Sequence, residues 1–204
     1  MMSYGIIYGL MSFLMPSVFP FIFILGIVSQ KLSISHKMYW VNTLLVLFSV
    51  SLTYQIVIMI GLEIDVLNIL LGALSFFNFW FVSLFLLLSV YLIGFFDLNN
   101  SLKIFLGLIV SLTLGVKVSL LALSSSGPIL GSLLASKNDN SIELVDFIKG
   151  EGLVICLVLL IIMIVSRKIS QKFKEKSWSD NIPKLLGLYL FITQIISIVS
   201  FFNT

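Results

Sequence analysis

Few residues of this chain could take part in chemistry. The sequence has one cysteine, Cys156, and one histidine, His36. Disulfide exchange needs a thiolate that attacks a disulfide sulfur, and a single cysteine cannot close an intramolecular disulfide. A lone thiol in an apolar segment stays protonated, so we expect Cys156 to pack as a small hydrophobic residue. His36 stands beside Lys37, which is typical of a solvated loop residue rather than a metal ligand.

Other reactive constellations are missing from the sequence. It has no cluster of metal-binding side chains at ligand spacing, no glycine-rich phosphate loop with its lysine and no Ser/His/Asp set. We therefore expect no metal, no cofactor and no catalytic residue, and we do not expect an enzyme. The basic segment RKISQKFKEKSWSDN (Arg167 to Asn181) is expected to set topology and touch anionic headgroups rather than bind nucleic acid.

Lys117, in LGVKVSLL, is the one charge expected deep in the membrane. It follows Lys103 by fourteen residues, which is about 21 Å along a helix and places it near or beyond the bilayer centre. A lysine there costs at least about 2.5 kcal/mol on the insertion scale. Two interpretations stay open. The ammonium group snorkels toward Glu63, Asp65 or a headgroup, or it forms an ion pair with a carboxylate of another subunit.

Composition indicates the elements that hold these residues. Hydrophobic residues make up 59% of the 204, charged residues only 10%, and the mean hydropathy is +1.17, which predicts an integral membrane protein. The apolar runs lack the alternation of barrel strands and match the roughly 20 residues of a spanning helix. We predict an all-α membrane domain over residues 1–204, with six spanning helices at Gly5–Ser29, Met38–Gly61, Asn68–Phe96, Lys103–Ser136, Gly152–Val165 and Ile182–Phe202.

Two of the expected helices contain helix-breaking residues. The first carries Pro16 and Pro20, in SFLMPSVFPF, and the fourth contains SSSGPILGS. Proline in a helix interior costs roughly 3 kcal/mol, so a break with a use is expected in each helix. The expected break in the fourth helix consists of Ser124, Ser126, Gly127, Pro128 and Gly131.

The distribution of charge predicts the orientation. With six spans, two basic residues, Lys137 and Lys149, fall on one side together with most of the acidic residues, including Glu151. Basic residues collect on the cytoplasmic side, so both termini are expected in the periplasm of a bacterial inner-membrane protein. Nine basic residues fall on the predicted cytoplasmic side: Lys31, Lys37, Lys103, Arg167, Lys168, Lys172, Lys174, Lys176 and Lys184.

The two halves of the chain resemble each other. A shift of 108 positions lays Ser17 on Ser125 and Pro20 on Pro128, with PSVFP over SSSGP. Each half, about 1–100 and about 101–204, would hold three helices, and an odd number makes the second half enter the membrane from the opposite face. Such inverted repeats place their interrupted helices near the midplane, where freed backbone groups need protein or water.

These segments also resemble a known family. GLMSFLMPSVFPFI (Gly9 to Ile22), LALSSSGPILGSLLA (Leu121 to Ala135) and FFNFWFVSLFLLLSVYLIGFFDL (Phe76 to Leu98) are similar to the first, fourth and third helices of the DsbD/CcdA membrane electron carriers. The resemblance covers nearly the whole chain. It implies that the two breaks face each other across a shared cavity and that each carries a redox position.

The chain departs from that family at the redox positions. Ser17 and Ser125 stand where the carriers keep their cysteine pair. A hydroxyl cannot exchange disulfides, so the resemblance implies a redox-inactive relative for which a thioredoxin-like partner is not expected. We expect a structural or regulatory subunit of a complex with other membrane proteins. Two alternatives stay open: the electron carrier with both cysteines replaced by serine, and a small-solute or ion transporter that reuses the inverted repeat.

Overall fold

A computed structural model describes residues 1–14, 19–61, 64–135, 141–173 and 181–202 of the chain. Within these ranges the chain is helical and has no strand. The helices are α1 (Met2–Leu14), α2 (Phe19–Leu32), α3 (His36–Gly61), α4 (Ile64–Ile93), α5 (Asn100–Ala135), α6 (Ser141–Phe173) and α7 (Asn181–Phe202).

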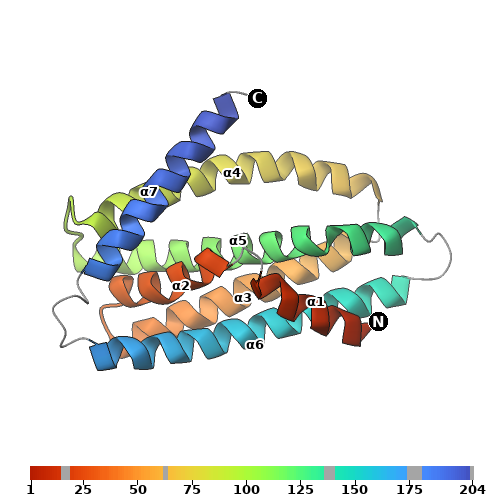
Figure 1. The fold of residues 1–204 in the computed structure, drawn as a ribbon, viewed down its shortest axis with the longest axis horizontal. Helices are drawn as coiled ribbons and strands as arrows, with labels where there is room; N and C mark the ends of the chain where they lie inside the picture. The colour runs from red at the N-terminus through yellow and green to blue at the C-terminus, as the bar shows by residue number, and fades with distance from the viewer. Residues whose placement is uncertain (15–18, 62–63, 136–140, 174–180, 203–204) are drawn as a thin grey trace.

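The long helices α3, α5 and α6 lie side by side and form the centre of the molecule (Figure 1). α3 and α5 run in the same direction and α6 runs in the opposite one, as the colours in Figure 1 show. α1 packs on α6, and α2 lies against α5 and α6. α4 packs mainly on α7, which crosses it and projects beyond the bundle (Figure 1). The core therefore has a central layer of long helices with a separate α4–α7 pair beside it.

The length and apolar composition of the central helices make them candidate membrane segments. Within the described residues, three segments are long and apolar enough to cross a bilayer. They are His36–Met59 in α3, Asn100–Leu123 in α5 and Glu143–Ile169 in α6. Shorter apolar helices accompany them at Met2–Leu14, Phe79–Ile93 and Asn181–Ile196. The all-helical membrane class predicted from composition agrees with this structure.

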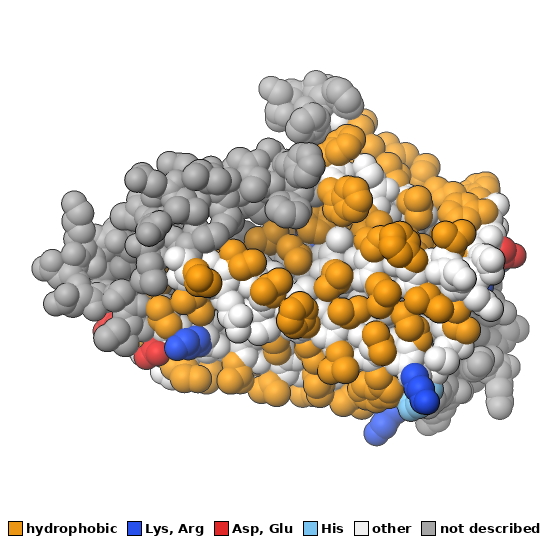
Figure 2. Space-filling view, turned by 180° about the vertical axis from the view of Figure 1, so that it is seen from behind, with side chains coloured by type: hydrophobic (Ala, Val, Ile, Leu, Met, Phe, Trp, Pro, Cys, Tyr) orange, Lys and Arg blue, Asp and Glu red, His pale blue; other side chains and the backbone are white. Residues whose placement is uncertain are grey.

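The outer surface is apolar along the same helices. Figure 2 shows hydrophobic side chains over most of the described part of one face, and the charged side chains visible there lie at its ends. Leu44 and Phe48 on α3, and Leu157 and Ile161 on α6, are more than half exposed. Water would not favour such a surface, whereas lipid chains match it. This distribution supports the placement of the helices in a membrane.

Glycines bring the helices into close contact. A Cβ atom at Gly5 would lie 2.1 Å from the backbone oxygen of Phe147, so α1 and α6 touch backbone to backbone. A Cβ atom at Gly115 on α5 would lie 2.7 Å from the backbone oxygen of Val46 on α3. Small residues permit this approach, which stabilises helix pairs in lipid through van der Waals contact.

The structure gives different outcomes for the two predicted helix breaks. Where one interrupted first helix was predicted, the structure has two helices, α1 and α2; Pro16 lies outside the described residues, and Pro20 belongs to α2. The break predicted in the fourth helix is wrong, because α5 runs without interruption from Asn100 to Ala135 through SSSGPILGS. Membrane helices tolerate proline where neighbouring groups satisfy the freed backbone carbonyl, so Pro128 does not by itself require a break.

Several predicted helix ends need correction. α4 begins at Ile64 rather than Asn68, and the fifth predicted helix ends at Phe173 rather than Val165, so the basic segment is helical from Arg167 to Phe173. The fifth predicted helix begins not at Gly152 but at Ser141, so the polar segment before Gly152 is largely helical. α4 ends at Ile93 rather than Phe96, because Gly94 has a φ of 97°. The Gly94 and Phe95 amides donate to the oxygens of Tyr91 and Val90, at 3.1 and 3.3 Å. This is the left-handed glycine cap that closes many helices.

Candidate functional site

Glu151 lies in the interior of α6 and has no exposed surface. It follows Leu144, Phe147 and Ile148 and precedes Ile155 at spacings of three or four residues, all of them buried. Side chains at these spacings share one face of a helix. The carboxyl group is therefore held on the stripe by which α6 packs into the molecule.

Ser126 on α5 is the hydrogen-bond partner of this carboxyl group. Its hydroxyl is buried and lies 3.1 Å from Glu151 Oε2 and 3.0 Å from the backbone oxygen of Leu123. A hydroxyl has one hydrogen, so Ser126 donates to one of these oxygens at a time. When Ser126 donates to Leu123, the bond to Glu151 persists only if the carboxyl group supplies a proton. The geometry thus links the Ser126 hydroxyl rotor to the protonation of Glu151.

Tyr54 on α3 completes the cluster. Its ring lies against the backbone of α6, because a Cβ atom at Gly152 would be 2.9 Å from Tyr54 Cγ. The phenol group interacts electrostatically with the Glu151 carboxyl group. The Tyr54 hydroxyl and Glu151 Oε1 are both buried, and each is the polar group that the other interacts with. Buried polar atoms that lack a well-formed hydrogen bond are rare in proteins, which sets this cluster apart from the apolar interior around it.

Helix α1 closes the cluster on another side. A Cβ atom at Gly9 would lie 3.1 Å from the backbone oxygen of Glu151 and 3.1 Å from the Cβ atom of Val154. Gly5 lies against Phe147 and the amide of Glu151. Glycine at both positions lets α1 approach α6 without displacing it. Helices α1, α3 and α5 therefore enclose the Glu151 side of α6, which keeps the carboxyl group away from lipid.

The cluster offers oxygen atoms, and the Cys156 thiol lies near enough to interact electrostatically with the Tyr54 phenol group. A carboxyl group, an aliphatic hydroxyl and a phenol can hold a proton, a water molecule or a monovalent cation. Among the described residues no group of three or more His, Cys, Asp and Glu side chains could hold a metal ion. Cys156 is half-buried on α6, with its sulfur 4.0 Å from the backbone oxygen of Leu47. As the only cysteine in the sequence, it has no second thiol in this chain with which to cycle.

The other predicted site residues are only partly described. Pro16 and Ser17 lie outside the described residues, so the structure does not test whether the two redox positions face each other. Ser125 is part of α5, but its side chain is not described. The same holds for the remaining residues of the predicted break: Ser124, Gly127, Pro128 and Gly131.

Lys117 lies on α5 and is half-buried. Its ammonium nitrogen is 5.0 Å from the centroid of the Phe81 ring on α4, a cation–π distance. The structure thus gives Lys117 a contact within its own chain. An ion pair with another subunit stays a prediction. His36 begins α3 at the surface, where its Nε2 lies 3.4 Å from the Trp40 indole nitrogen.

Sequence reasoning missed Glu151. It was counted among the acidic residues on the periplasmic side, just before a helix expected to begin at Gly152, and the structure shows instead that it lies in the interior of α6. A signal was present in IELVDFIKGEGLVI, where Leu144, Phe147, Glu151 and Ile155 fall at helical spacing. The nearby Asp146, Lys149 and Gly150 concealed this stripe, because together they are typical of a polar loop.

Comparison with known proteins does not assign the chain to a family or the Glu151 cluster to a known kind of site. The chain matches no protein-family model, no curated protein and no solved structure.

Proposed function

We propose that the chain is a redox-inactive relative of the DsbD/CcdA carriers that serves as a structural or regulatory subunit of a complex in a bacterial inner membrane. In this proposal all six predicted spans cross the membrane, as two inverted repeats with both termini in the periplasm. The quoted motifs and the packing of the helices support the repeat. The interior of the bundle supports the loss of redox function.

The pairing of helices supports the inverted repeat. An exchange of halves carries α3 into α6, α4 into α7, and the α1–α2 segment into α5. The contact of α1 with α6 then corresponds to the contact of α5 with α3, and the contact of α4 with α7 corresponds to itself. All three helix pairs are prominent in the structure. Glycines have equivalent roles in the two halves: Gly5 permits the close approach of α1 to α6, and Gly115 permits the close approach of α5 to α3. Two inverted repeats related by a two-fold axis in the membrane plane should show this correspondence of helix contacts.

The hydrogen bond between Ser126 and Glu151 carries the proposal. Ser126 immediately follows Ser125, the position where the family resemblance implies a cysteine, and its partner in the interior is a carboxyl group. A carrier needs a thiolate beside a disulfide, whereas this interior provides hydroxyl and carboxyl oxygens. We therefore assign the chain a role that does not depend on electron transfer.

Purification from the native membrane tests the role as a subunit. A tagged full-length chain, extracted in mild detergent, should elute in size-exclusion chromatography with other membrane proteins at a fixed molar ratio. The Cys156→Ala variant should elute in the same complex and support the same cellular function, because one thiol cannot relay electrons. A functional chain recovered without partners would contradict the subunit role. Disulfide reduction by the unmodified chain in liposomes would contradict redox inactivity.

Glu151 favours a second candidate, proton-linked or cation-linked transport. An ionisable residue buried among spanning helices is expensive and commonly marks an ion path. The single hydrogen of Ser126, shared between Leu123 and Glu151, gives the carboxyl group two hydrogen-bonding arrangements that differ by a proton. Residues from α3, α5 and α6 meet there, as a site between repeats requires.

Proteoliposomes that contain a pH-sensitive dye test this candidate. Under an imposed membrane potential, the wild-type chain should move protons, and Glu151→Gln should abolish that flux because glutamine cannot release a proton. Glu143→Gln, at the start of the same helix, is the matched control and should retain the flux. Equal dye responses from empty liposomes and wild-type liposomes would remove proton transport as a function.

A further inference from the structure

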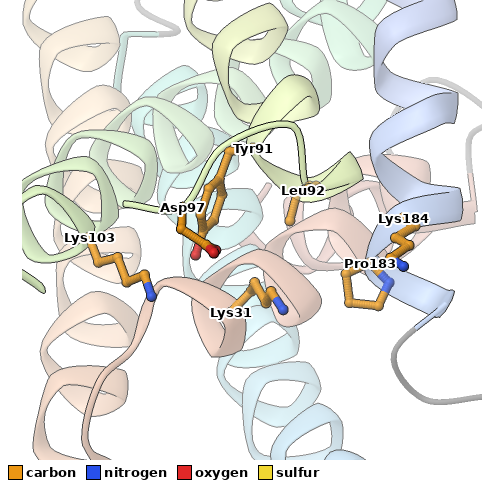
Figure 3. A pocket seen from close by; sticks show the side chains of 8 residues that line it. Lys31, Tyr91, Leu92, Asp97, Lys103, Pro183 and Lys184 are labelled. Atoms are coloured by element: carbon orange, nitrogen blue, oxygen red, sulfur yellow. The ribbon is translucent and has the colours of Figure 1, made fainter. Parts of the chain in front are cut away.

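A second polar feature lies at the other end of the described helices. A pocket of about 200 Å³ opens where α2 and α4 end and where α5 and α7 begin (Figure 3). Lys31 comes from the last turn of α2, Lys103 from α5 and Lys184 from α7. Its remaining lining residues are Tyr91, Leu92, Gly94, Asp97 and Pro183.

The charges of this pocket are unbalanced. Three ammonium groups face one carboxylate, so the lining carries an excess of positive charge. None of the three lysines lies within 4.0 Å of Asp97 in a salt bridge, although all four residues are described. The phenol group of Tyr91 interacts electrostatically with Asp97, and Figure 3 shows the two side chains next to each other. The lysines are therefore left to face the pocket.

Helix stability does not explain two of these lysines. Lys103 and Lys184 are each the fourth residue of their helix. The N-terminal turn of a helix carries partial positive charge, so a cation there is unfavourable. Neither α5 nor α7 has an acidic residue in its first turn to offset it. Two helix N-termini and their lysines would instead be stabilised by an anion between them.

The surroundings of the pocket indicate where such an anion comes from. Leu185 and Leu188 follow Lys184 on α7 and are 66% and 50% exposed. Phe95, beside the lining residue Gly94, is 77% exposed. Apolar side chains of this kind, next to lysines at helix ends, match a ligand that has both a phosphate group and acyl chains. A soluble phosphate would make no use of them.

We infer that this pocket binds the phosphate group of an anionic phospholipid headgroup, with Lys31, Lys103 and Lys184 as its ligands. The acyl chains of the lipid lie along the exposed apolar side of α7. A bound lipid of this kind would join the α4–α7 pair to α2 and α5, which α7 otherwise contacts sparsely. The inference requires only that the chain lies in a membrane, and it does not depend on the subunit role.

Lipid binding to the full-length chain in detergent tests the inference. Native mass spectrometry would compare phosphatidylglycerol with phosphatidylcholine of the same acyl chains, and inorganic phosphate would be added separately. The chain should prefer phosphatidylglycerol by at least about tenfold. Because each basic residue near a headgroup contributes roughly fivefold in affinity, Lys103→Gln with Lys184→Gln should remove most of that preference.

Matched variants separate the pocket from general charge. Lys168→Gln removes an exposed lysine on the same predicted side of the membrane but outside the pocket, so it should retain the preference. Lys184→Arg keeps the charge and should retain it as well. Equal losses in the Lys168→Gln variant and the pocket variants would overturn the inference. Inorganic phosphate that binds as strongly as the lipid, and is lost in the same variants, would assign the pocket to a soluble anion instead.

Discussion

At the scale of single residues, the Glu151 carboxyl group depends on a hydrogen bond from another helix. Ser126→Ala removes that bond and leaves a buried polar atom without its partner. An unsatisfied buried acceptor costs about 1–3 kcal/mol, so the free energy of unfolding should fall by that amount. Unfolding in mixed detergent micelles, followed by circular dichroism, is the measurement.

The control for this prediction is another serine. Ser83 on α4 is exposed, and its hydroxyl bonds only to the Phe79 oxygen of its own helix. Ser83→Ala should change the free energy of unfolding by less than about 0.5 kcal/mol. If the two serine variants unfolded alike, the Ser126–Glu151 bond would have no special weight in the fold.

At the scale of helices, the close contact between α1 and α6 depends on glycine, which has no side chain. The Cβ atom of an alanine at Gly5 would lie 2.1 Å from the Phe147 backbone oxygen, too close without a shift of one helix. Overpacking of this kind costs about 1–3 kcal/mol, so Gly5→Ala should destabilise the chain although alanine favours helices. Thermal unfolding in detergent measures the loss. Ile7→Ala, on the exposed side of α1, is the control and should have little effect.

The end of α4 gives a second test at this scale. Gly94 has a φ of 97°, which costs an ordinary L-residue roughly 1–2 kcal/mol. Gly94→Ala should lower the stability by about that much, and Gly94→Asn should lower it less, because asparagine tolerates left-handed conformations. No atom lies within 4 Å of the added Cβ, so sterics cannot cause the difference. Equal losses for both variants would rule out backbone strain as the cause.

At this scale, the features that the sequence could predict are those determined by local interactions along the chain. Apolar length is local, so the helical membrane class and most helix positions were predictable. The continuity of α5 was not, because its tolerance of Pro128 depends on surroundings that helix propensity does not include. The start of α6 at Ser141 was missed because Leu144 and Phe147 needed a partner surface, formed with α1, to count as buried. The close pairing of α4 with α7 likewise depends on Gly187, which lies against Leu92 and the Ser89 oxygen.

At the scale of the whole molecule, the larger number of basic residues at one end of the bundle should determine its orientation in the membrane. Lys168 is exposed near the end of α6, and Lys149 is exposed near the start of the same helix. About nineteen residues of helix separate them, close to 28 Å and thus to the thickness of the hydrocarbon core. Both lysines lie towards the ends of the Glu143–Ile169 segment, so we expect them at opposite faces of the membrane whichever way the chain inserts.

Single cysteines at these two positions decide the orientation. The charge distribution places Lys168 in the cytoplasm with most of the basic residues, and Lys149 in the periplasm. In a Cys156→Ala background, Lys149→Cys should react with a membrane-impermeant maleimide in intact cells. Lys168→Cys should react only after the membrane is permeabilised. The reverse labelling would place both termini in the cytoplasm. It would also move the lysine pocket to the periplasmic leaflet, because Lys31, Lys103 and Lys184 lie at the same end of the bundle as Lys168.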